Sequence, residues 1–118
     1  MKHSAATEAS KKMLEMIEKT SKEKRAECVY WGPYYGKSNH AIDIVGLETS
    51  VVDFYVDSGS KMNVLVTLDR YGWYTLRELL SPGKNFKFEC SQGPWSLMRI
   101  ETLESDPNLY ALGYFIAE

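Results

Sequence analysis

Short segments in which apolar and polar residues alternate, separated by turn residues, fill the chain from residue 28 to its end. In the segment 51–56, Val52, Phe54 and Val56 point one way and the residues between them point the other. This period of two is typical of β-strands with one buried face. Strands are therefore predicted over 28–31, 40–47, 51–56, 62–68, 86–90, 95–103 and 109–117.

The connections between these segments predict how the strands run. Polar turns at 91–94 and 105–108 separate the last three segments, and a parallel return would need a dozen residues or more, so antiparallel neighbours are expected. The segments 51–56 and 62–68, joined by the turn 57–60, predict a hairpin. Between them and the final strands, Thr75 and Glu78 fit a capping box, which predicts a short helix near 75–81.

The segment before the strands has a different pattern. Residues 4–26 contain no glycine or proline, and small or apolar residues such as Ala6, Ala9 and Met13 recur at spacings of three and four. Oppositely charged residues also recur four positions apart, as in Glu15 and Lys19. Both features favour an amphipathic helix.

Together these segments predict an α+β fold in one domain over 1–118. The helix of 1–26 is expected to pack on 27–118, a bent, mainly antiparallel sheet or small open barrel of about six or seven strands. A chain of 118 residues with 44% hydrophobic residues is large enough to bury a core of its own.

Charge and composition exclude several classes of protein. The chain has 14 basic and 16 acidic side chains, and residues 29–118 hold seven of the basic and eleven of the acidic ones, so the basic footprint of a duplex-binding protein is missing. An apolar run long enough to cross a membrane is absent, as is a signal peptide, so a cytoplasmic location is expected. Cys28 and Cys90 are then expected to be free thiols.

The sequence has no motif for nucleotide binding or for an activated nucleophile. Its two cysteines and two histidines lack the spacing of a zinc site, and Asp53, Asp57 and Asp69 lack the other ligands of a calcium loop. If the chain were a compact enzyme, His40, Tyr35 and Asp43 would be the first candidates, but His40 and Asp43 fall on opposite faces of one strand. We therefore expect no catalytic residues, no metal and no cofactor.

Aromatic residues gather in two segments that contain turn glycines. Tyrosine and tryptophan combine a large apolar area with a polar tip, which suits binding hot spots. An alternative is that Trp31 and Trp73 close the two ends of a barrel. The predicted binding residues are seven of the 15 aromatic residues, namely Tyr30, Trp31, Tyr34, Tyr35, Tyr71, Trp73 and Tyr74.

These features favour a small, non-catalytic protein-binding module, such as an inhibitor or accessory protein, whose partner is another protein. The alternative is binding of a small ligand, a nucleotide or single-stranded nucleic acid on an aromatic sheet surface. A homodimer formed through the N-terminal helix is a further possibility, and a compact enzyme has the least support.

Overall fold

The computed structural model describes Lys11, Leu14, Glu15 and residues 27–118. Residues 27–118 form eight strands and one 3₁₀ turn, η1 (Val45–Leu47). The strands are β1 (Glu27–Tyr35), β2 (Ser38–Asp43), β3 (Val51–Val56), β4 (Val64–Arg70), β5 (Tyr74–Leu80), β6 (Asn85–Glu89), β7 (Leu97–Thr102) and β8 (Tyr110–Ala117).

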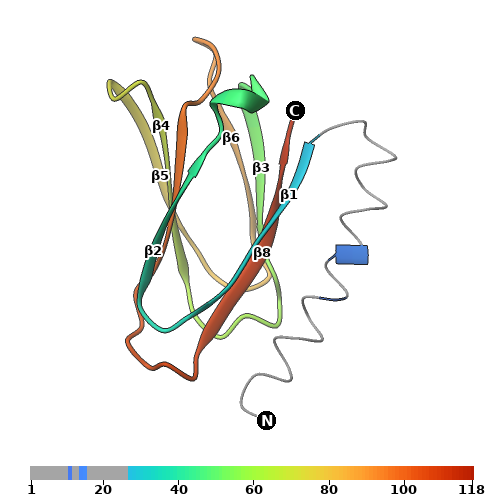
Figure 1. Cartoon of the computed structure of the whole chain (residues 1–118), viewed down its shortest axis with the longest axis vertical. Coiled ribbons are helices and arrows are strands. Elements are labelled where there is room, and N and C mark those ends of the chain that lie inside the picture. The colour runs from blue at the N-terminus through green and yellow to red at the C-terminus, as the bar shows by residue number, and fades with distance from the viewer. Residues whose placement is uncertain (1–10, 12–13, 16–26) are drawn as a thin grey trace.

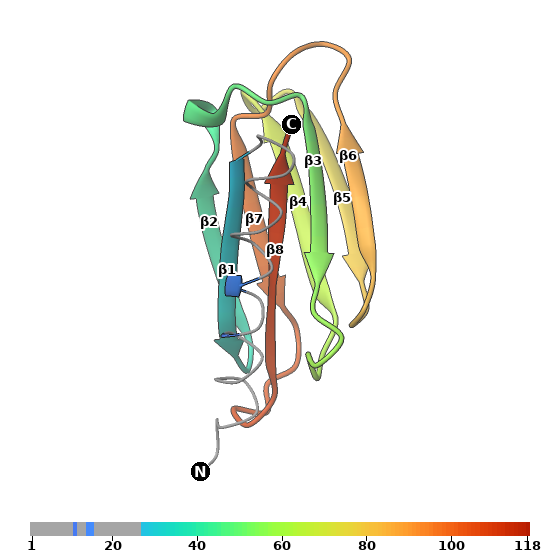
Figure 2. The same ribbon diagram turned by 90° about the vertical axis from the view of Figure 1, so that its right-hand side faces the viewer.

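The strands form two four-stranded sheets that pack face to face (Figures 1 and 2). The first sheet has the order β1-β8-β3-β6 and the second the order β2-β7-β4-β5, with every hydrogen-bonded pair antiparallel. Strands pair from the two ends of residues 27–118 inward: β1 with β8, β2 with β7, β3 with β6, and β4 with β5. The arrangement is that of one long hairpin, with its tip at β4–β5, folded over into two layers. This strand order is that of a jelly roll.

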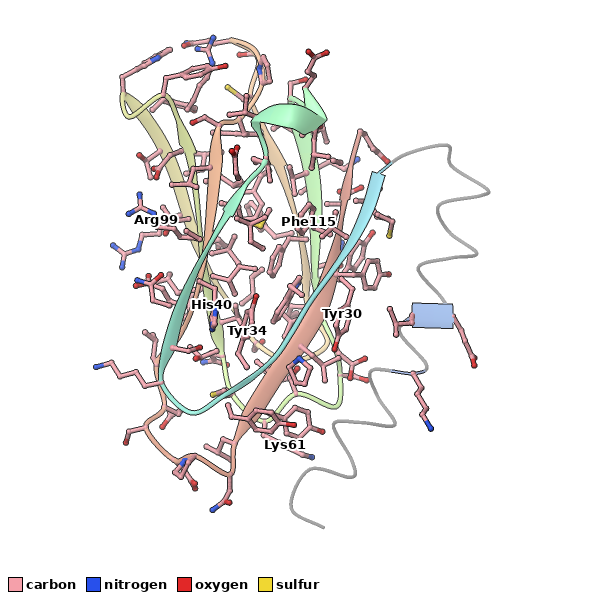
Figure 3. The ribbon with its side chains drawn as sticks, in the orientation of Figure 1. Tyr30, Tyr34, His40, Lys61, Arg99 and Phe115 are labelled. Atoms are coloured by element: carbon pink, nitrogen blue, oxygen red, sulfur yellow. The ribbon has the colours of Figure 1, made fainter. Side chains whose placement is uncertain are left out.

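Alternation along the strands supplies the core between the sheets. Phe54 and Phe115 project inward from the first sheet, and Leu68, Met98 and Ile100 project inward from the second, each with 0% of its surface exposed. Figure 3 shows Phe115 between the two layers. The prediction that 51–56 buries Val52, Phe54 and Val56 is confirmed by this core.

A glycine on the central strand β8 makes room for the largest core side chain. The ring of Trp31 lies against Gly113, where an added Cβ would come within 2.3 Å of the ring and 2.0 Å of the Tyr55 carbonyl oxygen. The Trp31 ring then stacks on Phe54, with ring centres 5.0 Å apart. Close packing at this point depends on the missing side chain of Gly113.

The α+β prediction is wrong, because the described part of the chain is almost entirely β-structure. The short helix predicted near 75–81 is strand β5, which pairs with β4 along its whole length. Leu76 and Leu80 of β5 turn inward and contribute to the core. A capping box contributes about 1 kcal/mol, whereas the strand gains a full ladder of hydrogen bonds and two packed leucines, so tertiary pairing prevails.

The predicted hairpin of 51–56 and 62–68 is also wrong. Strand β3 pairs with β8 and β6, whereas β4 pairs with β7 and β5, so the polar turn at 57–60 crosses from one sheet to the other. The connections β6–β7 and β7–β8 cross in the same way. A short connection fixes the antiparallel direction but not whether the two strands share hydrogen bonds. The result is a two-layer sandwich of eight strands, not a bent sheet or open barrel of six or seven.

The predicted N-terminal helix over 4–26 lies outside the described residues, except at Lys11, Leu14 and Glu15. The same holds for its packing across the sheet and for a dimer formed through it. Within the described residues, no helix has the length and apolar character needed to cross a bilayer. Cys28 and Cys90 are not joined by a disulfide.

Candidate functional site at the β4–β5 tip

Three of the four exposed aromatic residues of the described chain lie at the tip between β4 and β5, and the fourth is Phe86 of β6. Tyr71 and Trp73 are 62% and 59% exposed, and Tyr74 is 37% exposed. Tyr71 and Gly72 have φ values of 50° and 79°, as in the tight turns that match the twist of a hairpin. The Trp73 N–H donates to the Arg70 carbonyl oxygen over 3.2 Å and closes the turn.

A positive φ is uncommon for a bulky residue such as Tyr71, and the neighbouring β6–β7 loop holds it in place. The Tyr71 N–H donates to Oγ of Ser96 over 2.8 Å. The same Ser96 hydroxyl donates to the Asp69 carbonyl oxygen over 3.0 Å, which ties the loop to β4. The β6–β7 loop therefore anchors the β4 side of the turn.

The two tryptophans near the tip have opposite roles. The Arg70 guanidinium lies 4.8 Å from the centre of the Trp73 ring, a cation–π contact that limits the positions this exposed ring can take. Gly93 leaves room for Arg70, because a Cβ there would lie 3.0 Å from Nη2. Tyr74 stacks on Trp95, which is 0% exposed, with ring centres 5.9 Å apart. The tip thus presents exposed rings on a base that is continuous with the core.

The structure separates the other predicted aromatic residues from this tip. Trp31 is 2% exposed and belongs to the core, so it offers no surface to a partner. Tyr34 is half-buried between Trp31 and His40, with its ring 3.7 Å from the imidazole (Figure 3). Burial raises the pKa of the Tyr34 phenol. The sequence could not distinguish these rings from those of the tip, because both groups lie beside glycines.

The remaining two predicted residues, Tyr30 and Tyr35, lie on the outer face of the first sheet, where they pack against an apolar cluster of β8. The rings of that cluster stack on one another, as Tyr55 does on Tyr114 at 4.6 Å between ring centres. Burial raises the pKa of both of these phenols. Tyr114 is only 9% exposed, and Tyr30, Tyr35 and Tyr55 are half-buried, so none of these rings is as exposed as those of the tip.

The candidate enzymatic and metal-binding residues are not brought together. His40 is on the inner side of β2 beside Tyr34, whereas Asp43 accepts a hydrogen bond from the Val45 N–H over 3.0 Å at the far end of that strand. Asp57 accepts from the Gly59 N–H over 2.8 Å and shapes its own turn. Among the described residues, no three histidine, cysteine, aspartate or glutamate side chains are grouped to hold a metal ion.

Sequence reasoning missed a polar depression on the outer face of the second sheet, next to the tip. Its volume is about 350 Å³ and its lining comes from β4, β5 and β7: Thr67, Asp69, Thr75, Arg77, Arg99 and Glu101. Their alternation with apolar residues was a signal that these positions share an outward face. Only the strand order shows that the three strands are neighbours.

No family model matches this chain, and neither the curated proteins nor the solved structures contain a significant match. The jelly-roll fold supports many unrelated functions. The function is therefore argued from the exposed residues themselves.

Proposed function

We propose that this protein is a non-catalytic protein-binding module that docks through the β4–β5 tip. The observation that carries the proposal is the exposure of Tyr71, Trp73 and Tyr74 on one anchored turn. Large exposed aromatic side chains are unusual on a free surface when they are contiguous, and such patches mark interaction sites. The partner should offer a concave apolar pocket that accepts one or two rings.

The way the tip is held supports this role. Because the Tyr71 N–H and the Arg70 guanidinium are already engaged, little conformational freedom remains to be lost when a partner binds. Tryptophan, tyrosine and arginine are also the residues most enriched at binding hot spots. The tip holds one or more residues of each of these types, since Arg70 lies beside Trp73 and next to Tyr71.

The alternative, a ligand or single strand stacked on an aromatic sheet face, has less support. On the outer face of the first sheet the rings contact one another, Tyr55 stacked on Tyr114 and Tyr35 tilted against Tyr110, and Tyr110 and Tyr114 are 7% and 9% exposed. The acidic side chain of Asp53 also lies on that face, where Lys87 is 3.8 Å away. An exposed, positively charged track for a phosphate backbone is not formed by these residues.

The proposal is tested by affinity capture with the full chain and two variants, Trp73→Ala and Leu103→Ala. Leu103 is 51% exposed and lies in the β7–β8 loop, at the end of the sandwich opposite the tip, so it is a matched control (Figure 1). A specific partner should be retained by the wild type and by Leu103→Ala but lost by Trp73→Ala. With the purified partner, Trp73→Ala should raise Kd by about 30-fold or more, as expected for a hot-spot ring.

Two outcomes would contradict the proposal. One is a partner that the Trp73→Ala variant binds as tightly as the wild type. The other is a partner that Leu103→Ala loses to the same extent, since the binding surface would then lie elsewhere. Circular dichroism of each variant shows whether a loss of binding follows from a loss of folding.

A further inference from the structure

The geometry points to a carboxylate-binding site in the polar depression on β4, β5 and β7. In the strand register, Arg77 of β5 and Arg99 of β7 are the direct partners of Thr67 of β4. Directly opposed residues on neighbouring strands bring their Cβ atoms within about 4.5–5.5 Å of each other. Two guanidinium groups therefore flank one short hydroxyl side chain, and Figure 3 shows Arg99 pointing away from the core.

An ion pair fixes the position of one of the two arginines. The Asp69 carboxylate is 7% exposed, accepts a hydrogen bond from the Thr75 hydroxyl over 2.8 Å, and pairs with Nη2 of Arg99. A guanidinium has five N–H donors, so this contact leaves most of them available. Asp69 therefore holds Arg99 at the edge of the depression without using up its capacity to bind an anion.

The other two charged residues of the depression differ in whether they have a partner. Arg77 is exposed and has no ion-pair or hydrogen-bond partner within the described part of the chain. Glu101 accepts a hydrogen bond from the Asn39 side chain over 3.2 Å, which draws its carboxylate toward β2. The two acidic groups are thus engaged, whereas Arg77 is free to bind.

The floor of the depression carries a hydroxyl without a partner in the described part of the chain. Thr67 is 9% exposed, and its hydroxyl has no hydrogen-bond partner among the residues that the structure describes. The Thr67 oxygen is not one of the buried, unpaired side-chain atoms of the described chain, so it is accessible from the depression, and its hydroxyl can donate one hydrogen bond to a ligand atom. An anionic oxygen seated there would accept from the Thr67 hydroxyl and from the guanidinium groups on either side.

The charge balance favours a carboxylate over a phosphate. Two arginines and two engaged carboxylates leave no large positive excess for a dianion, whereas the free donors of Arg77 match the planar, bidentate geometry of a carboxylate. A volume of about 350 Å³ accommodates a small organic acid or one acidic side chain. A free organic acid and an acidic side chain present the same carboxylate to the site. The proposal of this site is independent of the proposal that the tip is a docking surface.

The test is a titration of the isotope-labelled full chain with sodium acetate, followed by NMR. The amide signal of Thr67 and the side-chain Nε–H signals of Arg77 and Arg99 should shift saturably, and sodium chloride at equal ionic strength should not reproduce the effect. Thr67→Val and Arg77→Gln should each weaken acetate binding at least about tenfold, because each removes a hydrogen bond to a charged group. Lys61→Gln should leave binding unchanged, since Lys61 is exposed at the opposite end of the sandwich (Figure 3).

Other outcomes would overturn the assignment. These are shifts that follow chloride as closely as acetate, shifts that persist in Arg77→Gln, or tighter binding of inorganic phosphate than of acetate. A second arm uses an aspartate residue blocked at both ends as the ligand. If it binds at least as tightly as acetate, the depression takes an acidic side chain, and if it is excluded while acetate binds, the natural ligand is a small free acid.

Discussion

Replacing Trp31 with alanine should destabilise the protein far more than the same replacement at Trp73. Trp31 is 2% exposed, its ring is stacked on Phe54, and it fits against the bare backbone of Gly113. The partner groups come from β3 and β8 and cannot collapse into the space that the ring leaves. Truncation of a buried tryptophan costs about 3–5 kcal/mol of unfolding free energy, which we expect here.

Replacing Trp73 with alanine should lower the unfolding free energy by less, because this residue is 59% exposed in the folded state. A tryptophan side chain buries up to about 250 Å² when fully covered, so at about 25 cal/mol per Å² the covered part of this ring contributes about 2.6 kcal/mol at most. The contact with Arg70 lies within that limit, since an exposed cation–π pair contributes about 0.5–1 kcal/mol. A net loss of about 1 kcal/mol is expected.

Urea denaturation followed by far-UV circular dichroism measures both losses, since tryptophan fluorescence would itself change with the substitutions. The entropy of unfolding is about 2.1 cal/mol/K per residue, so in a domain of this size 1 kcal/mol corresponds to about 4 °C in Tm. In a thermal melt followed by the same signal, Trp31→Ala should melt at least about 12 °C below the wild type and Trp73→Ala less than about 8 °C below it. Trp31→Phe serves as a control, because it keeps a stacked ring and should retain part of the lost stability.

Equal losses of stability at the two positions would refute this reasoning. The Trp73 ring would then be part of the folded core in solution, and the exposed tip that carries the proposed function would not exist. A Trp31→Ala variant as stable as the wild type would equally contradict the packing of Trp31 between the sheets.

Two further predictions concern the backbone and the tyrosines. Gly113→Ala should lower the unfolding free energy by about 3 kcal/mol or more, because the new methyl group meets the Tyr55 carbonyl at 2.0 Å. Gly72→Ala, where nothing lies within 4 Å but φ is +79°, should lose only about 1–2 kcal/mol, and identical melting temperatures would contradict the close approach at Gly113. Burial raises the pKa of Tyr34, Tyr55 and Tyr114, so their contribution to stability is fully present below the unfolded-state pKa of about 10 and is lost as pH rises above it. Urea midpoints measured from pH 8 to 11 should be constant at first and then fall, and an unchanged midpoint at pH 11 would disprove this.

Sequence reasoning located most strands because alternation is a local property of the chain. Each pair of neighbours in the segment 51–56 must point to opposite faces, so the apolar triplet of β3 was assigned to the core correctly. The segment 75–81 shows the limit of such reasoning. Thr75 and Glu78 carry a local helix signal, but β5 gains more by pairing with β4, and that gain comes from residues on another strand.

The candidate site was likewise predicted only in part from the sequence. The sequence identified Tyr71, Trp73 and Tyr74 as members of an aromatic turn, and the structure exposes all three. It gave the same importance to Trp31, which the structure buries. An aromatic ring beside a glycine can point toward the core or toward solvent. Only the position of the opposite sheet decides between these two directions. The polar depression escaped notice because its residues come from three strands.

By itself, the sequence determined where most of the strands form, which side of those strands is apolar, and which turns carry aromatic residues. These properties depend on neighbours within a few positions along the chain. The tertiary structure alone decided that eight strands nest into two layers, that β3 and β4 lie in different sheets, and that Arg77 and Arg99 flank Thr67. A strand's pattern specifies two faces but no partner, because hydrogen bonding at a strand edge is the same for any sequence, and the partner is chosen by how all the faces pack together.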